Sequence, residues 1–344
     1  MIKKTLFFTL ALFLVLAACG PSPEEIATMT ASAWTATPTI TPSPTPTPIP
    51  YDMTVKVTDA DGIPIAGASV TVGDGDPILT DANGATSWIN LDPPDGSVNV
   101  SAQGYFASEQ TFSLNRGPNE VVVALERDPF GLLPSQACAP GETLLYLEDF
   151  QDGEAEGWPD IDFRANGWNL EEYTDEPGNT VVSNNLMEHL GANLQDQTFA
   201  EAVWRVRFLV QGRRAISLNW LQNNGVEVDS QFVDDARYQI VVDKGNTEIR
   251  RLTIPVLNIP VGRGRGAATG VWHNIEISTF QGETLIYLDG ARVSGYRDPK
   301  PLPGGGIGLE LIPFDNAIEG TINYFDNISV CGLSAPFTSM FVAP

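Results

Sequence analysis

The sequence predicts an all-β protein made of two sandwiches, a small one followed by a larger jelly roll. Three observations favour this class. Apolar and polar residues alternate over short runs from residue 53 onward, which is the period of a half-buried strand. Turn residues separate these runs at intervals of about 8 to 12 residues. The chain of 344 residues contains 32 Gly and 26 Pro, a composition that favours turns and linkers over long helices.

The charge and composition exclude several classes of protein. Lys and Arg together number 19 and Asp and Glu 43, which gives a formal charge of −24. A chain this acidic is repelled by phosphate backbones, so no nucleic-acid partner is expected. Two His and three Cys leave few ligands for a zinc or iron-sulfur site. We expect a monomer whose acidic surface keeps both modules soluble outside the cell.

Residues 1–18 have the form of an export signal. Two lysines precede an apolar run over residues 6–16, which is shorter than the roughly 20 residues of a membrane-spanning helix. The run ends in the sequence L-A-A-C-G, which resembles the lipobox of bacterial lipoproteins. The resemblance implies that Cys19 becomes the lipid-bearing first residue. We therefore expect an exported protein, lipid-anchored to the outer face of a bacterial membrane at the cell surface. The alternative is an ordinary secretory signal.

Residues 19–50 are expected to form a disordered tether. From residue 38 to residue 50, Pro alternates with Thr, Ser and Ile, which removes backbone donors and favours an extended polyproline II chain. At about 3.1 Å per residue, this stretch is a semi-rigid spacer of roughly 40 Å. Its role is to set a distance from the membrane.

Residues 51–128 carry the first set of strands. Met53, Val55 and Val57 alternate with polar residues, and the same pattern recurs up to residue 125. The motifs resemble the carboxypeptidase regulatory-like (transthyretin-like) domain: D-x-x-G at 59–62, G-A-x-V at 67–70, T-D-x-x-G at 80–84 and G-Y at 104–105. The resemblance implies a seven-stranded sandwich that has no catalytic residues and serves as a spacer or binding accessory. We expect its clustered Asp residues to be solvated turns rather than calcium ligands.

Residues 129–143 form a linker rich in Pro and Gly, and residues 144–332 form the larger domain, before a tail at 333–344. Between about 8 and 14 strands in a segment of this size indicate a jelly roll. The patterned strands predicted in it are 202–210, 215–221, 238–243, 248–254, 272–279, 284–288, 306–312 and 324–330.

Five motifs in the larger domain resemble the concanavalin A-like lectin/glucanase superfamily. They appear in that superfamily's order and cover nearly the whole segment: D-F-x-D-G at 149–153 with Trp158, W-H-N-I-E-I at 272–277, L-I-Y-L-D-G at 285–290, G-I-G-L at 306–309 and F-D-N-I at 325–328. The resemblance implies a concanavalin A-like jelly roll. Function does not follow from this fold, because its members include both binding modules and enzymes.

We expect no catalytic residues in the larger domain. Retaining glycosidases need two carboxyl groups about 5 to 5.5 Å apart, and those of this fold carry them on one strand as E-x-D-x-(x)-E. No such run occurs in the sequence. His189 and His273 are the only imidazoles, and neither lies in a nucleophile pattern.

Carbohydrate binding is the function that the resemblance favours. Lectins of this fold stack aromatic rings on sugars and bind hydroxyl groups with polar side chains. A polysaccharide or other glycan is the partner expected from this resemblance. For each candidate, the competing interpretation is a core aromatic or a solvated polar residue. The candidates chosen by alternation are Arg205, Arg207, Asn219, Gln222, Tyr238 and Tyr296.

A structural calcium ion is a further expectation from the resemblance. Related jelly rolls join the first and last strands through one ion held by an acidic residue of each. The matching positions are Glu148 or Asp149 and Asp326. An Asp that caps the last turn would give the same sequence pattern.

Cys138 and Cys331 flank the larger domain. In an exported chain we expect them to form a disulfide that joins the linker to the last strand.

These expectations combine into a surface lipoprotein that presents a non-catalytic, carbohydrate-binding jelly roll on a β-sandwich spacer. A structural or adhesive surface protein without a sugar ligand is the alternative. A glycan-active hydrolase is the third candidate.

Overall fold

The structure is a computed structural model that describes residues 49–162, 167–185, 191–212, 214–228, 231–254, 257–313 and 322–342. The signal peptide, Cys19 and nearly all of the tether lie outside the described residues. The described residues from Pro50 onward belong to one compact unit. No helix in the described part of the chain is long and apolar enough to cross a membrane.

The first sandwich contains the seven strands expected from the sequence. One sheet has the order β4-β1-β7 and the other β3-β2-β5-β6. Alternate residues of β1, such as Val55 and Val57, are fully buried, so its period-2 pattern lines the core between the sheets. The strands are β1 Tyr51–Asp59, β2 Ser69–Val72, β3 Ile78–Leu79, β4 Ala85–Trp88, β5 Asp95–Ser101, β6 Ser108–Ser113 and β7 Gly117–Leu125.

Two Asp residues of this sandwich make the turns that were expected of them. Asp59 Oδ1 accepts hydrogen bonds from the backbone N–H groups of residues 61 and 63, at 3.0 and 2.8 Å. Asp81 Oδ1 accepts from the N–H groups of residues 83 and 85, at 2.8 and 2.9 Å. These backbone hydrogen bonds hold the pKa of Asp81 below its usual value. Both carboxyl groups therefore stabilise the backbone of their own loops.

The segment between the sandwiches contains one short helix, α2 Pro134–Ala137, that the linker prediction missed. Pro at its first position suits a helix start, where no intrahelical partner is needed for the missing N–H. The disulfide between Cys138, just after α2, and Cys331 of the last strand is present as predicted.

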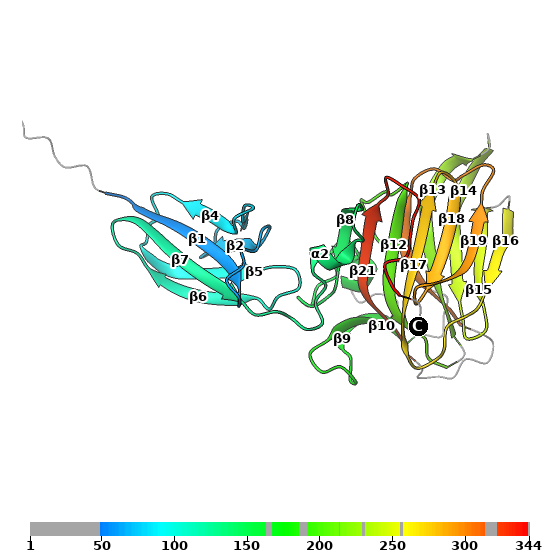
Figure 1. Ribbon diagram of the computed structural model, residues 1–344, viewed down its shortest axis with the longest axis horizontal. Helices are drawn as coiled ribbons and strands as arrows, with labels where there is room; N and C mark the ends of the chain where they lie inside the picture. The colour runs from blue at the N-terminus through cyan, green and yellow to red at the C-terminus, as the bar shows by residue number, and fades with distance from the viewer. Residues whose placement is uncertain are drawn as a thin grey trace, which may run out of the picture. The chain divides into compact units, whose positions relative to one another are not determined.

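The jelly roll consists of two layered sheets (Figure 1). The eight-stranded sheet has the order β19-β18-β17-β12-β21-β10-β9, with β8 paired to β21. The six-stranded sheet has the order β11-β20-β13-β14-β15-β16. Its elements are β8 Thr143–Glu148, α3 Pro159–Asp162, β9 Trp168–Glu172, β10 Thr180–Asn184, β11 Gly191–Asn193, β12 Ala202–Leu209, β13 Arg214–Val228, β14 Gln231–Val242, β15 Thr247–Ile254, β16 Leu257–Gly264, β17 Trp272–Phe280, β18 Glu283–Leu288, β19 Ala291–Arg297, β20 Gly306–Pro313 and β21 Asn323–Gly332.

The core lies between the inner faces of these two sheets. Trp204 of β12 stacks on Trp220 of β13 with ring centroids 6.2 Å apart, so one aromatic pair joins the two layers. Both rings are fully buried. Burying a large apolar side chain contributes about 1.5 to 3 kcal/mol relative to leaving it exposed. All eight strands predicted in this domain are present, and β13 runs seven residues beyond its predicted end at residue 221.

Candidate functional site: the polar face of the six-stranded sheet

The face of the six-stranded sheet that points away from the core carries a cluster of polar side chains, which we call the polar face. Along β14, Ala236, Tyr238 and Ile240 are buried in the core, so the residues between them point the other way. Glu310 of β20 likewise follows the core residue Leu309. The polar face comprises Asn219, Gln222, Asp235, Arg237, Gln239 and Glu310.

A β-bulge places Asn219 and Gln222 on the same face. Residues three apart in a regular strand point to opposite faces. The register of β13 with both of its neighbours shifts after Trp220, and Leu221 has a φ of 51°. The extra residue reverses the alternation. Gln222 Oε1 then lies 3.1 Å from the position that a Cβ on Gly308 would occupy, on the outer side of β20.

Glu310 is the centre of the polar face. Its Oε2 accepts hydrogen bonds from Ser217 Oγ at 3.0 Å, Gln239 Nε2 at 2.9 Å and Asn219 Nδ2 at 3.4 Å. Glu310 is 8% exposed and Asn219 is 3% exposed. Two of these donors come from β13, the strand next to β20, and the third comes from β14, on the far side of β13. They hold the carboxyl group in place and orient the two amides that contact it.

Four buried polar atoms of the polar face have no hydrogen-bond partner among the described residues. Three are acceptors and one is a donor: Asn219 Oδ1, Gln222 Oε1, Asp235 Oδ1 and Arg237 Nε. A buried polar atom without a partner costs about 1 to 3 kcal/mol. Because folded proteins satisfy the great majority of such atoms, four on one face indicate groups that a bound ligand or water completes.

Two carboxyl groups of the polar face interact electrostatically. Arg237 Nη1 donates a hydrogen bond to Asp235 Oδ2. Burial raises the pKa of Asp235 above its usual value, the nearby Arg237 charge lowers it, and the charge of Glu310 raises it further. Asp235 and Glu310 are therefore close enough for the charge of one to affect the other.

The structure corrects the prediction that Arg205 binds a ligand. Arg205 lies on β12 of the other sheet and is 4% exposed. Its Nη1 and Nη2 donate to the two carboxyl oxygens of Glu142 at 2.7 and 2.9 Å, and its Nε donates to Glu276 at 3.0 Å. All three nitrogens of its guanidinium group are thus bound to carboxyl groups inside the protein.

Tyr238 is not a platform for sugar stacking, because its ring is 1% exposed. Its hydroxyl donates to Asp298 Oδ2 at 2.5 Å, and burial raises its pKa above the usual value. Tyr296 packs against it, with ring centroids 6.5 Å apart, and is partly buried. Arg207 contacts Asp326 and lies over the Trp272 ring at 4.1 Å. Ligand binding by Tyr296 and Arg207 stays a prediction.

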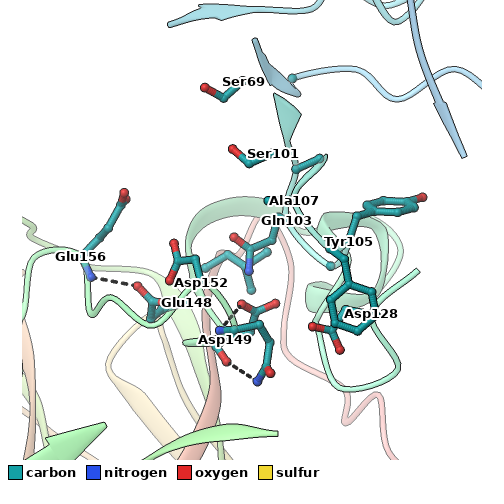
Figure 2. A pocket seen from close by; sticks show the side chains of 16 residues that line it. Ser69, Ser101, Gln103, Tyr105, Ala107, Asp128, Glu148, Asp149, Asp152 and Glu156 are labelled. Atoms are coloured by element: carbon teal, nitrogen blue, oxygen red, sulfur yellow. Dashed lines mark hydrogen bonds between the residues drawn. The ribbon is translucent and has the colours of Figure 1, made fainter. Parts of the chain in front are cut away.

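The contacts of the predicted calcium residues do not fit an ion held between the first and last strands. Both carboxyl oxygens of Glu148 accept backbone N–H groups, from Phe150 at 2.8 Å and Glu156 at 3.0 Å, and Figure 2 shows the second contact. Burial raises the pKa of Glu148 to about 8. Asp326 Oδ2 accepts from Arg207 Nη1 at 2.8 Å, and that guanidinium repels a cation.

Asp149 also makes contacts that hold backbone in place. Its Oδ2 accepts from Leu132 N at 2.7 Å and its Oδ1 from Gln151 N at 3.3 Å. Among the described residues, one cluster has the spacing of metal ligands, and it consists of Glu142 with the two disulfide-bonded cysteines. A thiol in a disulfide is not available as a thiolate ligand.

His273 is held in place by neighbours on both sides of its ring. Its Nδ1 lies 2.7 Å from Asp289 Oδ2 and its Nε2 2.9 Å from the carbonyl oxygen of Ala268. The expectation that His273 is a satisfied structural residue agrees with these contacts. His189 lies outside the described residues.

Asp235, Arg237, Gln239 and Glu310 were not among the predicted ligand residues. Their signal in the sequence is alternation, since 235, 237 and 239 lie between core positions of one strand. Glu310 is a single carboxyl group in an otherwise apolar strand, a position where a charge is stable only with partners.

The fold and site define an all-β chain with a jelly roll, and solved structures of this class resemble it. No protein-family model matches the chain, and no curated protein matches it. One similar structure is a Bacillus subtilis protein of unknown function with a galectin-like fold, at 11% identity and TM-score 0.40, covering 55% of this chain and 95% of the other.

Two further similar structures carry carbohydrate-related names. The carbohydrate-binding module CBM66 from Bacillus subtilis has 12% identity and TM-score 0.35, covering 48% of this chain and 94% of its own. The catalytic domain of an endo-1,3-β-glucanase (laminarinase) from Thermotoga petrophila has 13% identity and TM-score 0.39, covering 56% and 99%.

Proposed function

We propose that this chain is a surface-anchored lipoprotein whose jelly roll binds a carbohydrate at the polar face without cleaving it. The observation that carries the proposal is the set of four buried, unpartnered polar atoms on that face. Sugar hydroxyl groups both donate and accept hydrogen bonds, so they suit a face that offers acceptors and a donor together. The bulge at Leu221 and the Glu310 hydrogen bonds orient these atoms before any ligand arrives.

The binding proposal predicts which substitutions weaken affinity. Asn219→Ala and Gln239→Ala, made separately in the soluble chain from residue 20 onward, are each expected to weaken glycan binding about tenfold or more, because each removes an oriented amide. Titration calorimetry with oligosaccharides selected from a glycan array measures the loss. Gln110→Ala, at an exposed position of β6, is the matched control and should bind as the unmodified chain does. A flat array across all polysaccharides contradicts the proposal.

A second candidate function is glycan hydrolysis, which the interaction between Asp235 and Glu310 favours. Glycosidases use a carboxylic acid with a raised pKa and a second carboxylate on either side of the scissile bond. Burial and the charge of Glu310 raise the pKa of Asp235, as the acid of a glycosidase requires. Release of reducing ends from a bound oligosaccharide, abolished by both Asp235→Asn and Glu310→Gln, would establish hydrolysis in place of simple binding.

The anchoring proposal depends on Cys19 and predicts its modification. Expressed in a bacterium fed labelled palmitate, the full chain is expected to carry the label and to fractionate with membranes, since several acyl chains bury many CH₂ groups at about 0.8 kcal/mol each. Cys19→Ser removes the acceptor sulfur and should abolish both label and membrane association. Ser22→Ala, three residues further on, is the control and should change neither. An unlabelled, freely released chain would contradict lipid anchoring.

A further inference from the structure

The direction of the Asn219 amide is set by its neighbour. Glu310 Oε2 receives three hydrogen bonds, so it acts as an acceptor. Asn219 must therefore turn its Nδ2 toward Glu310, which leaves Oδ1 pointing away from it. Oδ1 belongs to a side chain that is 3% exposed and has no partner among the described residues. Asn219 Oδ1 is therefore an acceptor in a fixed position. Rotating the amide to present Nδ2 there would lose the hydrogen bond to Glu310.

The unpartnered atoms of the polar face are mostly acceptors. Asn219 Oδ1, Gln222 Oε1 and Asp235 Oδ1 each need a donor, and Arg237 Nε alone needs an acceptor. A carboxylate or sulfate group brings acceptors only, so it cannot satisfy these three acceptor atoms. A hydroxyl group brings one donor and two acceptor positions, so it can satisfy atoms of either kind.

Gly308 lies beside two of the polar side chains of this sheet. It pairs with Asn219 on one side and with Asn193 on the other, so it lies in the strand between them. A Cβ at this position would lie 2.4 Å from Asn193 Oδ1 and 3.1 Å from Gln222 Oε1. The next outward position on this strand is also glycine, Gly306. The absence of a Cβ at residue 308 therefore lets the amide oxygens of Asn193 and Gln222 lie against this strand.

We propose that the polar face selects a neutral, hydroxyl-rich glycan segment over an acidic one, with Gly308 leaving space for the amide side chains of Asn193 and Gln222. This inference rests on the proposed function and adds the substrate class. The ligand donates hydroxyl protons to the amide oxygens of Asn219 and Gln222 and to Asp235, and accepts from Arg237. A uronate or sulfated segment places its anionic groups against the same three acceptors.

The test compares polysaccharides that differ only in charge. Oligomers of galacturonate, mannuronate and glucuronate are each paired with their carboxyl-reduced, neutral counterparts and titrated against the soluble chain from residue 20 onward. The expected result is that the neutral member of the bound pair binds at least about ten times more tightly than the acid. Equal or tighter binding of the acid overturns the inference and leaves carbohydrate binding in place. No binding to any member of any pair overturns the inference, and a flat response across the whole glycan array overturns the proposed function itself.

Two variants test the geometry. The backbone at residue 308 does not require glycine, so Gly308→Ala is expected to leave thermal unfolding unchanged. The added Cβ is expected to displace the side chains of Asn193 and Gln222 and to weaken binding of the neutral glycan about tenfold. Gln222→Lys replaces an acceptor by a cationic donor and should shift the neutral-to-acid affinity ratio toward the acid. Gln110→Lys adds the same charge on an exposed strand of the small sandwich and should leave the ratio unchanged. A ratio that Gln222→Lys does not move overturns the assignment of the acceptor set.

Discussion

Replacing Cys138 and Cys331 together by Ala is expected to lower the free energy of unfolding of the jelly roll by up to roughly 5 kcal/mol. The disulfide closes a loop across a sequence separation of 193 residues, and the entropy that such a closure removes from the unfolded chain grows with loop length. The bridge ties the segment after α2 to β21, which pairs with β12, β10 and β8. Urea unfolding followed by tryptophan fluorescence measures the change, because the buried Trp residues of the core all lie in this domain.

Reduction of the unmodified chain provides the control for the disulfide prediction. Under a strong reductant its unfolding midpoint should fall to that of the double variant, whereas the reductant should not change the variant. A double substitution in β6 of the small sandwich, Ser108→Ala with Ser113→Ala, should leave the jelly-roll transition in place. Equal midpoints for the oxidised chain and the double variant would contradict the prediction.

Arg205→Met is expected to destabilise the jelly roll by about 3 to 5 kcal/mol, the usual cost of removing one partner from a buried ion pair. The substitution leaves the carboxyl groups of Glu142 and Glu276 without their shared cation, and Glu276 is fully buried. Ser339 and Met340 also donate to Glu276, so the segment that follows β21 is held by the same carboxyl group. Met retains much of the apolar volume of the Arg side chain, so the loss of stability measures the effect of removing the charge. Chemical unfolding of the two proteins measures it.

An exposed ion pair of the same sheet provides the matched control. Arg297 and Glu283 lie 3.0 Å apart, with side chains 67% and 37% exposed. Arg297→Met should cost about 0 to 1 kcal/mol, because water screens an exposed pair. If Arg205→Met is as mild as Arg297→Met, the buried carboxyl groups are stabilised by something other than Arg205 and the argument from burial is wrong.

The strands that the sequence predicted are those with strong alternation. Trp204, Val206 and Phe208 of β12 point into the core, as the period-2 pattern requires. β16 was not predicted, because Pro260 and two glycines interrupt its pattern. It lies at the edge of the six-stranded sheet, where a residue without an N–H group is tolerated. In the sequence, an edge strand with an interrupted pattern resembles a loop, and only its position in the sheet distinguishes the two.

The candidate site was partly predictable. Asn219 and Gln222 were expected to bind a ligand, and both lie on the polar face. Strict alternation would have placed them on opposite faces, and the bulge at Leu221 brings them together. Arg205 shows the opposite case, because its pattern is that of a ligand-binding Arg while its partners come from residues 142 and 276. Contacts over such separations leave no local signal in the sequence.

The sequence by itself determined the all-β class, the jelly roll and the disulfide, because alternation, turn residues and cysteine count are local or compositional properties. Only the tertiary structure decided which polar residues form a site. Glu310 and Asn219 are 91 residues apart in the chain, and pairing of β13 with β20 makes them neighbours. The same pairing sets Gly308 beside Asn219, so the acceptors and the glycine next to them are brought together by strand order and register.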